Sequence, residues 1–216
     1  MRRYEFVFTF LAVLMLLINT AYGQKERWIA FDPSSNAGTP PDVQVVESDE
    51  NQTVIRIKIS GMWSEEVYEG KIQFQSLYLP NFKTTGEVGK AAMPVIRELL
   101  GIISDAEKTS VVQVSIKDSL MFDGINVFPY LKPVQEESET KFVIDSSFYA
   151  EDIFYPTELG QSGPIGEWGD LRIANIEINP IKFNPLKHLL IAYTELEVRI
   201  VHKGNIQDLQ PISPFW

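Results

Sequence analysis

Apolar and polar side chains alternate with a period of two residues along much of this chain. Every second position in the segment 55–59 is isoleucine, and the residues between them are Arg56 and Lys58. Because successive side chains of a strand point to opposite faces, this pattern predicts a strand with one buried face. A shorter alternating run at 43–45 comes before it. The acidic residues 47–51 between the two runs predict the tip of a hairpin.

Further runs with the composition of strands follow, at residues 71–79, 110–116, 125–128, 141–144, 171–178 and 189–202. Turn signals separate most of them, at Gly89, Asp123-Gly124, 160–163 and Gly204. Many short strands at this spacing predict an all-β fold, an antiparallel β-sandwich with little helix.

One segment fits a helix as well as a strand. In residues 95–103 the apolar side chains recur at helical spacing, at Ile96, Leu99, Leu100 and Ile103. Pro94 stands directly before the segment and favours extended backbone, because proline is accepted at the first residue of a strand. We therefore predict a strand.

The N-terminus has the three parts of a secretory signal peptide: a basic start, an apolar run at 6–18 and the small residues Ala21 and Gly23. The apolar run is shorter than the roughly 20 residues of a membrane-spanning helix. We predict cleavage after Gly23, which makes Gln24 the first mature residue. Because a lipoprotein needs a cysteine at that position, the mature chain is expected to be secreted or periplasmic and free of the membrane.

The remaining sequence divides into three parts. Residues 24–42 are rich in Pro, Gly, Ser and Asn and predict a flexible lead-in. Residues 43–203 contain the strand-like runs and have the length of one domain. Residues 204–216 include two prolines and predict a C-terminal linker or a truncated junction.

Charge and cysteine content exclude several classes of protein. Without its first 23 residues the chain has 17 basic and 28 acidic side chains. Nucleic acid is therefore not an expected partner, because no basic surface is available for phosphates. The chain has no cysteine, so the core and not disulfides must hold the fold. No metal or other cofactor is expected.

The sequence also contains no recognisable catalytic motif. A cysteine peptidase needs a thiolate nucleophile, which this chain lacks. A serine hydrolase needs a serine, a histidine and an acid, but neither His188 nor His202 lies in such a motif and Gly-x-Ser-x-Gly is absent. We interpret both histidines as structural. We interpret the neighbouring carboxylates at 65–66, 136–137 and 151–152 as solvated surface.

Several segments, in this order, resemble the propeptide of gingipain-type (family C25) cysteine peptidases. The first is an entry segment at 89–95, and a strand pair ending at Pro129 follows it. Next comes the aromatic segment 148–156, which ends in Tyr155-Pro156. The last is a corner at 183–186 that contains Asn184-Pro185, where a turn brings the final strand back antiparallel. The resemblance also favours a strand at 95–103.

The resemblance implies a β-sandwich that assists folding of the peptidase and keeps it latent with a loop over the catalytic cleft. The partner would be a cognate gingipain-like cysteine peptidase, in cis or in trans. The loop that matches this position has as its candidate residues Leu131, Lys132, Pro133, Val134, Gln135 and Glu136.

Two functions remain open from the sequence. The first is the N-terminal propeptide of a secreted gingipain-like cysteine endopeptidase, which acts by stoichiometric binding and not as an enzyme. The alternative is an exported β-sandwich adhesion or carbohydrate-binding module, because aromatic side chains on such folds stack on sugars. The aromatic candidates for that role are Trp28, Trp63, Tyr68, Tyr130 and Trp168.

Overall fold

A computed structural model describes residues 26–102, 109–132, 141–169 and 171–202 of the chain. These residues form twelve strands and one short 3-10 turn, η1 (Phe148–Ala150). Every paired strand runs antiparallel to its neighbour. The predicted all-β fold is therefore confirmed.

The strands form three sheets. One sheet has the order β1 (Glu26–Ala30), β4 (Gly61–Glu69), β5 (Ile72–Tyr78). A second has the order β6 (Lys83–Thr85), β7 (Met93–Gly101), β10 (Leu171–Ile178), β9 (Gly160–Trp168). The third has the order β11 (Ile181–Asn184), β12 (Leu189–Val201), β3 (Gln52–Lys58), β2 (Asp42–Ser48), and β8 (Ser110–Phe122) pairs along the other side of β12.

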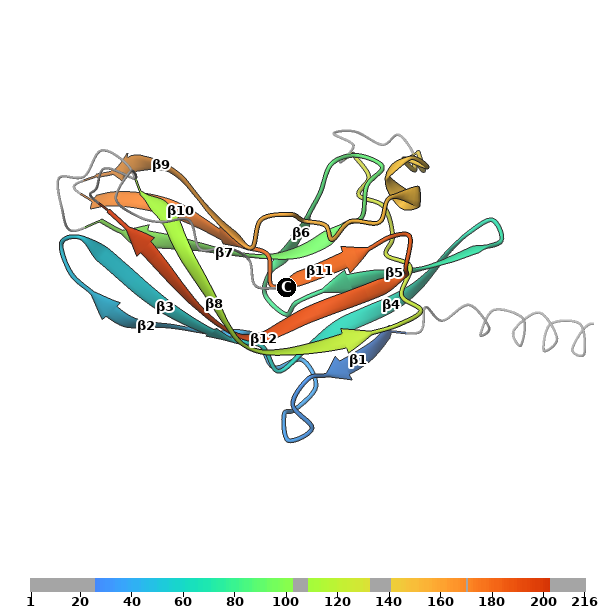
Figure 1. Ribbon diagram of the computed structural model, residues 1–216, viewed down its shortest axis with the longest axis horizontal. Helices are drawn as coiled ribbons and strands as arrows, with labels where there is room; N and C mark the ends of the chain where they lie inside the picture. Colours follow the sequence, from blue (N-terminus) through green and yellow to red (C-terminus); the bar gives the residue numbers. More distant parts are fainter. Residues whose placement is uncertain (1–25, 103–108, 133–140, 170, 203–216) are drawn as a thin grey trace, which may run out of the picture.

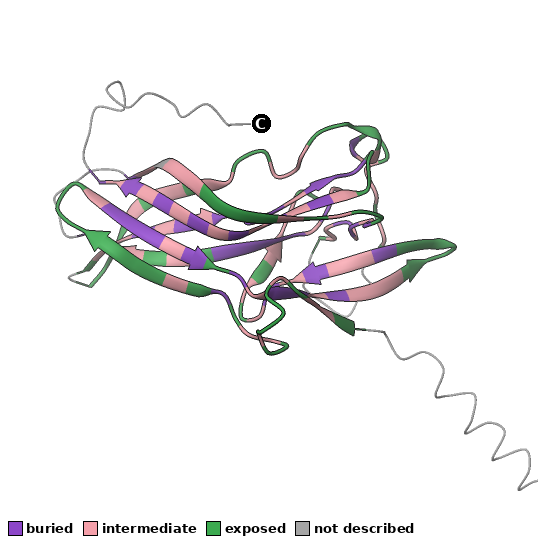
Figure 2. Cartoon of the chain, turned by 60° about the horizontal axis from the view of Figure 1, so that its bottom comes forward, coloured by how far each residue is buried: buried purple, intermediate pink, exposed green. Residues whose placement is uncertain are grey.

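The second and third sheets face each other as the two layers of a sandwich, and the β4–β5 hairpin extends beyond them at one end (Figure 1). Buried residues alternate with partly exposed ones along β12 (Figure 2). Ile57 of β3 and Leu196 of β12 are directly opposite in register, and both are fully buried. The alternation that predicts β3 thus also marks the centre of the core.

The structure confirms several predicted strands. β3, β5, β10 and β12 lie within or close to the predicted runs, and β8 continues the run 110–116 as far as Phe122. β2 and β3 form the predicted hairpin, in which the Asp49 carboxylate accepts hydrogen bonds from the backbone N–H groups of Asn51 and Gln52. β7 is a strand despite its helical spacing, because its backbone pairs with β6 and β10.

Other predicted elements are wrong. The glycines at 160–163 do not form a turn but begin β9, and a Cβ at Gly160 would lie only 2.9 Å from Ile178 Cδ1. Glycine is needed there for close approach to β10. Residues 125–128 and 141–144 are not strands. Residues 125–128 make one isolated bridge, between Val127 and Gln75, and Pro129 after them has no N–H to extend the pairing.

The predicted lead-in 24–42 differs from a flexible linker in its described part. β1 pairs with β4, and this places Trp28 beside Trp63. The two rings are 5.3 Å apart in an edge-to-face contact. Interaction between aromatic neighbours across strands stabilises the added strand. Among the described residues of this segment, the prediction from its Pro, Gly, Ser and Asn content is correct for residues 31–41, which form turns and irregular structure.

His202, at the end of β12, is buried and fixes the β2–β3 hairpin. Its Nε2 lies 2.8 Å from Thr53 Oγ1, and its backbone N–H donates to the Asn51 carbonyl. Its Nδ1 is buried without a hydrogen-bond partner among the described residues. Burial lowers the pKa of His202, against an opposing effect of the Asp49 carboxylate.

This lowered pKa predicts a loss of stability in mild acid. The unfolded chain binds a proton at His202 more readily than the folded chain, so stability is complete above an unfolded pKa of about 6.5 and falls as the pH drops below it. Urea unfolding between pH 7 and pH 5 measures this dependence, and His202→Gln should reduce it. His188→Gln is the matched control, because His188 is exposed. An identical pH dependence in all three proteins would contradict the account.

Candidate functional site

The predicted inhibitory loop begins inside the described structure and continues outside it. Leu131 is half-buried and Lys132 is exposed. Pro133, Val134, Gln135 and Glu136 lie outside the described residues, as do the predicted cleavage-site residues Ala21, Gly23 and Gln24. The described part of this site is the loop base, defined as the stems 127–132 and 141–145 together with Gly89 and Lys90.

Gly89 joins the two stems. Its N–H donates to the Tyr130 carbonyl at 2.9 Å, and its carbonyl accepts from the Asp145 N–H at 2.9 Å. The Tyr130 N–H in turn donates to the Lys90 carbonyl at 2.7 Å. One glycine thus contacts the chain on both sides of the segment 133–140.

Only glycine fits this position well. Gly89 has a φ of +87°, a backbone conformation that other residues rarely adopt. A Cβ at Gly89 would lie 3.0 Å from the Asp145 nitrogen, which is the atom that donates to Gly89. A side chain here would therefore strain the backbone and crowd one stem of the loop.

Aromatic side chains fill the space beneath the stems. Phe128 of the first stem and Phe142 of the second have ring centroids 5.9 Å apart. Both rings also contact the buried Phe74 of β5, at 5.7 and 6.0 Å. Burial of this cluster stabilises the loop base in addition to the hydrogen bonds of Gly89.

The carboxylate of Asp145 ends the second stem in a turn. It accepts hydrogen bonds from the Ser147 hydroxyl at 2.5 Å, the Ser147 N–H at 3.0 Å and the Phe148 N–H at 3.1 Å. These bonds, with the serine hydroxyl foremost, lower the pKa of Asp145. The turn leads directly into η1, so the stem and the aromatic segment form one continuous unit.

The aromatic segment 148–156 fixes the first stem to the rest of the fold. The Tyr149 hydroxyl donates to the Val127 carbonyl at 2.6 Å, and burial raises the pKa of this phenol. Tyr155 and Phe183 exchange both of their backbone hydrogen bonds, at 2.9 and 2.8 Å. The aromatic segment, one of the motifs that carry the family resemblance, thus contacts both the first stem and β11 (Ile181–Asn184).

The corner at Asn184-Pro185 also has a defined role. Asn184 Nδ2 donates to the Asp152 carboxylate at 2.8 Å, and the Lys187 ammonium lies 2.9 Å from the same carboxylate. The side-chain bonds from Lys187 and Asn184 lower the pKa of Asp152. β11 and β12 pair antiparallel across this corner, which confirms the predicted return of the final strand.

Charge at the loop base is mixed. The Lys90 ammonium lies 2.8 Å from the Glu87 carboxylate, and this contact raises the pKa of Lys90. Lys132 stands exposed at the point where the chain leaves the first stem. Among the described residues, no group of three or more His, Asp or Glu side chains is placed to hold a metal ion.

The structure separates most of the aromatic residues considered for sugar binding. Trp28 and Trp63 are in contact, and Tyr78 stacks on Trp63 with centroids 6.5 Å apart. Tyr68 lies near the tip of the β4–β5 hairpin, and Trp168 lies at the end of β9 in another sheet. The five residues therefore do not form one platform.

The backbone hydrogen bonds by which Gly89 joins the two stems could not be predicted from the sequence. The sequence identified Gly89 as a turn signal and as part of the entry segment, but its partners Tyr130 and Asp145 lie 41 and 56 residues further along the chain. A lone glycine gives no information about such distant partners. The only available signal was the combination of Gly89 with the aromatic segment in the family order.

No helix in the described ranges is long and apolar enough to cross a bilayer.

Comparisons with known proteins identify the family. Residues 34–210 match the Propeptide_C25 family. Lys-gingipain of Porphyromonas gingivalis (strain ATCC 33277) is 26% identical over 140 residues, which cover 61% of this chain and 8% of that protein. Lys-gingipain HG66 of Porphyromonas gingivalis is 25% identical over the same length. The chain thus spans a small part of these curated relatives.

Two solved structures have a similar fold. One is the complex of Porphyromonas gingivalis RgpB pro- and mature domains, with a TM-score of 0.66 and 18% identity over 76% of this chain and 84% of that chain. The other concerns zymogenic latency of gingipain K from Porphyromonas gingivalis, with a TM-score of 0.66 and 22% identity over 82% of this chain and 99% of that chain. At these identities the likeness shows the fold alone. Because the family match extends over most of the sequence, the chain belongs to the Propeptide_C25 family, the propeptides of gingipain-type cysteine peptidases.

Proposed function

We propose that this chain is the N-terminal propeptide of a secreted gingipain-like cysteine endopeptidase. It binds the peptidase domain stoichiometrically, in cis or in trans, assists its folding and keeps it latent by covering the catalytic cleft. The predicted signal peptide directs export. The chain is not itself the cysteine peptidase, because it has no cysteine to serve as the nucleophile.

The observation that carries this proposal is the loop base. A segment that must enter a cleft without rearranging needs both of its ends held, because preorganisation reduces the entropy lost on binding. Gly89 holds both stems by backbone hydrogen bonds, and the Phe74, Phe128 and Phe142 cluster packs beneath them. The shared fold with the pro-domain of the RgpB complex supports a peptidase as the partner.

The sequence at the first stem suits an inhibitor that resists cleavage. An exposed Lys132 can enter an acidic specificity pocket as a substrate side chain does. Pro133 follows it, and proline removes the N–H and constrains the chain at the position after the scissile bond. Such a segment occupies the cleft but presents a poor geometry for hydrolysis.

Replacing Lys132 tests the role of this residue. Residues 24–216 added in trans should inhibit a gingipain-like peptidase, and Lys132→Ala should weaken inhibition by at least about 1 kcal/mol, as loss of a buried charged contact does. The measurement is the inhibition constant against a fluorogenic peptide. Lys141→Ala is the matched control, because Lys141 is also an exposed lysine but lies on the opposite stem. Equal inhibition by the parent and Lys132→Ala would reject the role of Lys132.

A further inference from the structure

The β4–β5 hairpin is fixed to the start of the first stem of the loop base. The Gln75 N–H donates to the Asn126 carbonyl at 2.7 Å, and the Phe128 N–H donates to the Gln75 carbonyl at 2.9 Å. The Asn126 N–H donates to Gln75 Oε1 at 2.7 Å, and Asn126 Nδ2 donates to the Gln73 carbonyl at 3.0 Å. These hydrogen bonds hold the hairpin and the loop base together as one unit.

One face of the hairpin continues outward from the loop base. Phe74 of β5 packs beneath the stems, and Val67 of β4 lies opposite it in register. Nearer the tip, Ile72 lies opposite Glu69. Because side chains two residues apart on a strand point to the same side, Glu65, Val67, Glu69 and Ile72 share the side of Phe74. We call these four residues the hairpin face.

The hairpin face is open to solvent at its outer end. Ile72 is 51% exposed and Glu69 is exposed, whereas Glu65 and Val67 are half-buried. The hairpin extends beyond the sandwich at the end of the molecule where η1 lies (Figure 1), and its tip is exposed (Figure 2). A partner that approaches the loop base from this end therefore also meets the hairpin face.

The charge of the hairpin face indicates what kind of partner fits it. Glu65 lies opposite Glu26 of β1 in register. Neither these two carboxylates nor Glu69 has an ion-pair partner among the described residues. Like charges opposite each other in a sheet cost stability, and basic side chains of a partner would offset that cost. The exposed Ile72 beside them adds an apolar contact.

We propose that the hairpin face binds the peptidase domain beside its catalytic cleft. Ile72 makes an apolar contact there, and Glu65 and Glu69 pair with lysine or arginine side chains of the peptidase. This inference rests on the proposed function. Because the hairpin is fixed to the first stem, a peptidase that receives the loop in its cleft is brought up to this face. The second contact sets the orientation in which the domain binds.

Two variants of the hairpin face test the proposal, in the inhibition assay with residues 24–216 and a gingipain-like peptidase. Ile72→Ser should raise the inhibition constant about fivefold or more, as truncation of a buried interface contact does. Glu69→Lys should slow association several-fold at low ionic strength, and this difference from the parent should shrink as salt is added.

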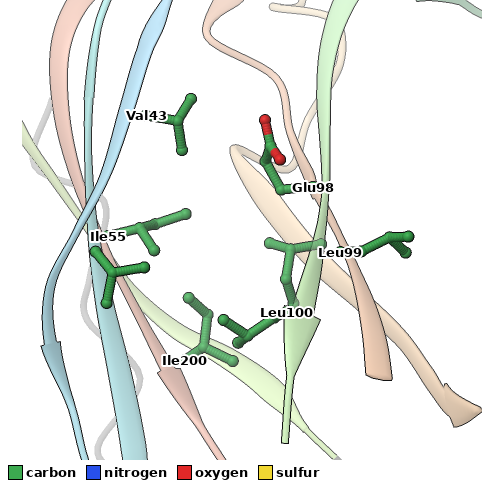
Figure 3. Close-up of a pocket in the computed structure, with 8 residues that line it drawn as sticks. Val43, Ile55, Glu98, Leu99, Leu100 and Ile200 are labelled. Carbon is green, nitrogen blue, oxygen red and sulfur yellow. The ribbon is translucent and has the colours of Figure 1, made fainter. Parts of the chain in front are cut away.

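Each variant has a matched control. Leu99→Ser replaces an isomeric side chain that is 59% exposed on β7, at an apolar cleft between the facing sheets (Figure 3) and away from the loop base. Glu66→Lys makes the same charge change on the other side of the hairpin, opposite Gln75. Both controls should inhibit as the parent does. Urea unfolding checks that all four variants are folded.

The possible failures can be told apart. If Ile72→Ser and Glu69→Lys inhibit as well as the parent, the inference is overturned and the proposed function stands. Equal weakening by Glu66→Lys and Glu69→Lys would also overturn the inference, because the effect would not belong to one face. A parent domain that does not inhibit at all would overturn the proposed function, and this inference with it.

Discussion

Replacing Ile57 by aspartate is expected to unfold the domain. Ile57 is fully buried at the centre of the third sheet, opposite Val43 on one side and Leu196 on the other. A carboxylate at this position loses its hydration with no cation to compensate, and the cost is at least about 4 kcal/mol. That is a large part of the roughly 5–15 kcal/mol by which domains of this size are stable.

Far-ultraviolet circular dichroism and urea unfolding of residues 24–216 measure this effect. Met121→Asp is the matched control, because it also replaces an apolar side chain of the same sheet but at a position that is 66% exposed. The control should keep the β-type spectrum and a cooperative transition. A folded Ile57→Asp protein with the parent's unfolding midpoint would contradict the assignment of the core.

The second large effect is expected at Gly89. Gly89→Ala should destabilise the domain and weaken inhibition in trans more strongly than any change in the loop itself. The methyl group meets a backbone strained by about 1–2 kcal/mol in the left-handed region, and it also approaches the Asp145 nitrogen to 3.0 Å. Relief of this contact moves one stem and separates the two ends of the loop.

The variant Gly124→Ala distinguishes the effect of backbone strain from the effect of the close approach to the Asp145 nitrogen. Gly124 has a φ of +72°, similar to that of Gly89, but nothing lies within 4 Å of a Cβ there. The Gly124→Ala protein should lose only the stability that the backbone strain costs, and the folded protein should inhibit the peptidase as well as the parent does. If Gly89→Ala inhibits as well as Gly124→Ala, the loop base has no part in binding.

The sequence allowed the fold class to be predicted because local patterns determine it. Alternation of the isoleucines from 55 to 59 gives the face of β3 directly, and Pro94 correctly favours a strand where the spacing of leucines suggests a helix. The prediction fails where glycine composition and strand pairing conflict. Gly160 reads as a turn residue, but its lack of a side chain is what allows β9 to approach β10.

The candidate site was predictable in its order along the chain but not in its contacts. The aromatic segment was found from its motif, yet the bond from Tyr149 to the Val127 carbonyl joins residues that no local pattern relates. The same holds for Gly89, whose partners come from two distant segments. Backbone hydrogen bonds between distant segments depend on the fold, and the sequence around one partner does not specify the other.

The central claim is that this domain covers the catalytic cleft of a gingipain-type peptidase. Alkylation of the peptidase's nucleophilic cysteine tests it most directly, because residues 24–216 contain no cysteine and every labelled thiol belongs to the peptidase. Titration with this domain should suppress labelling in proportion to the amount added, with full protection at a one-to-one ratio. Labelling that continues at the rate of the free peptidase when the domain is in excess would contradict the account.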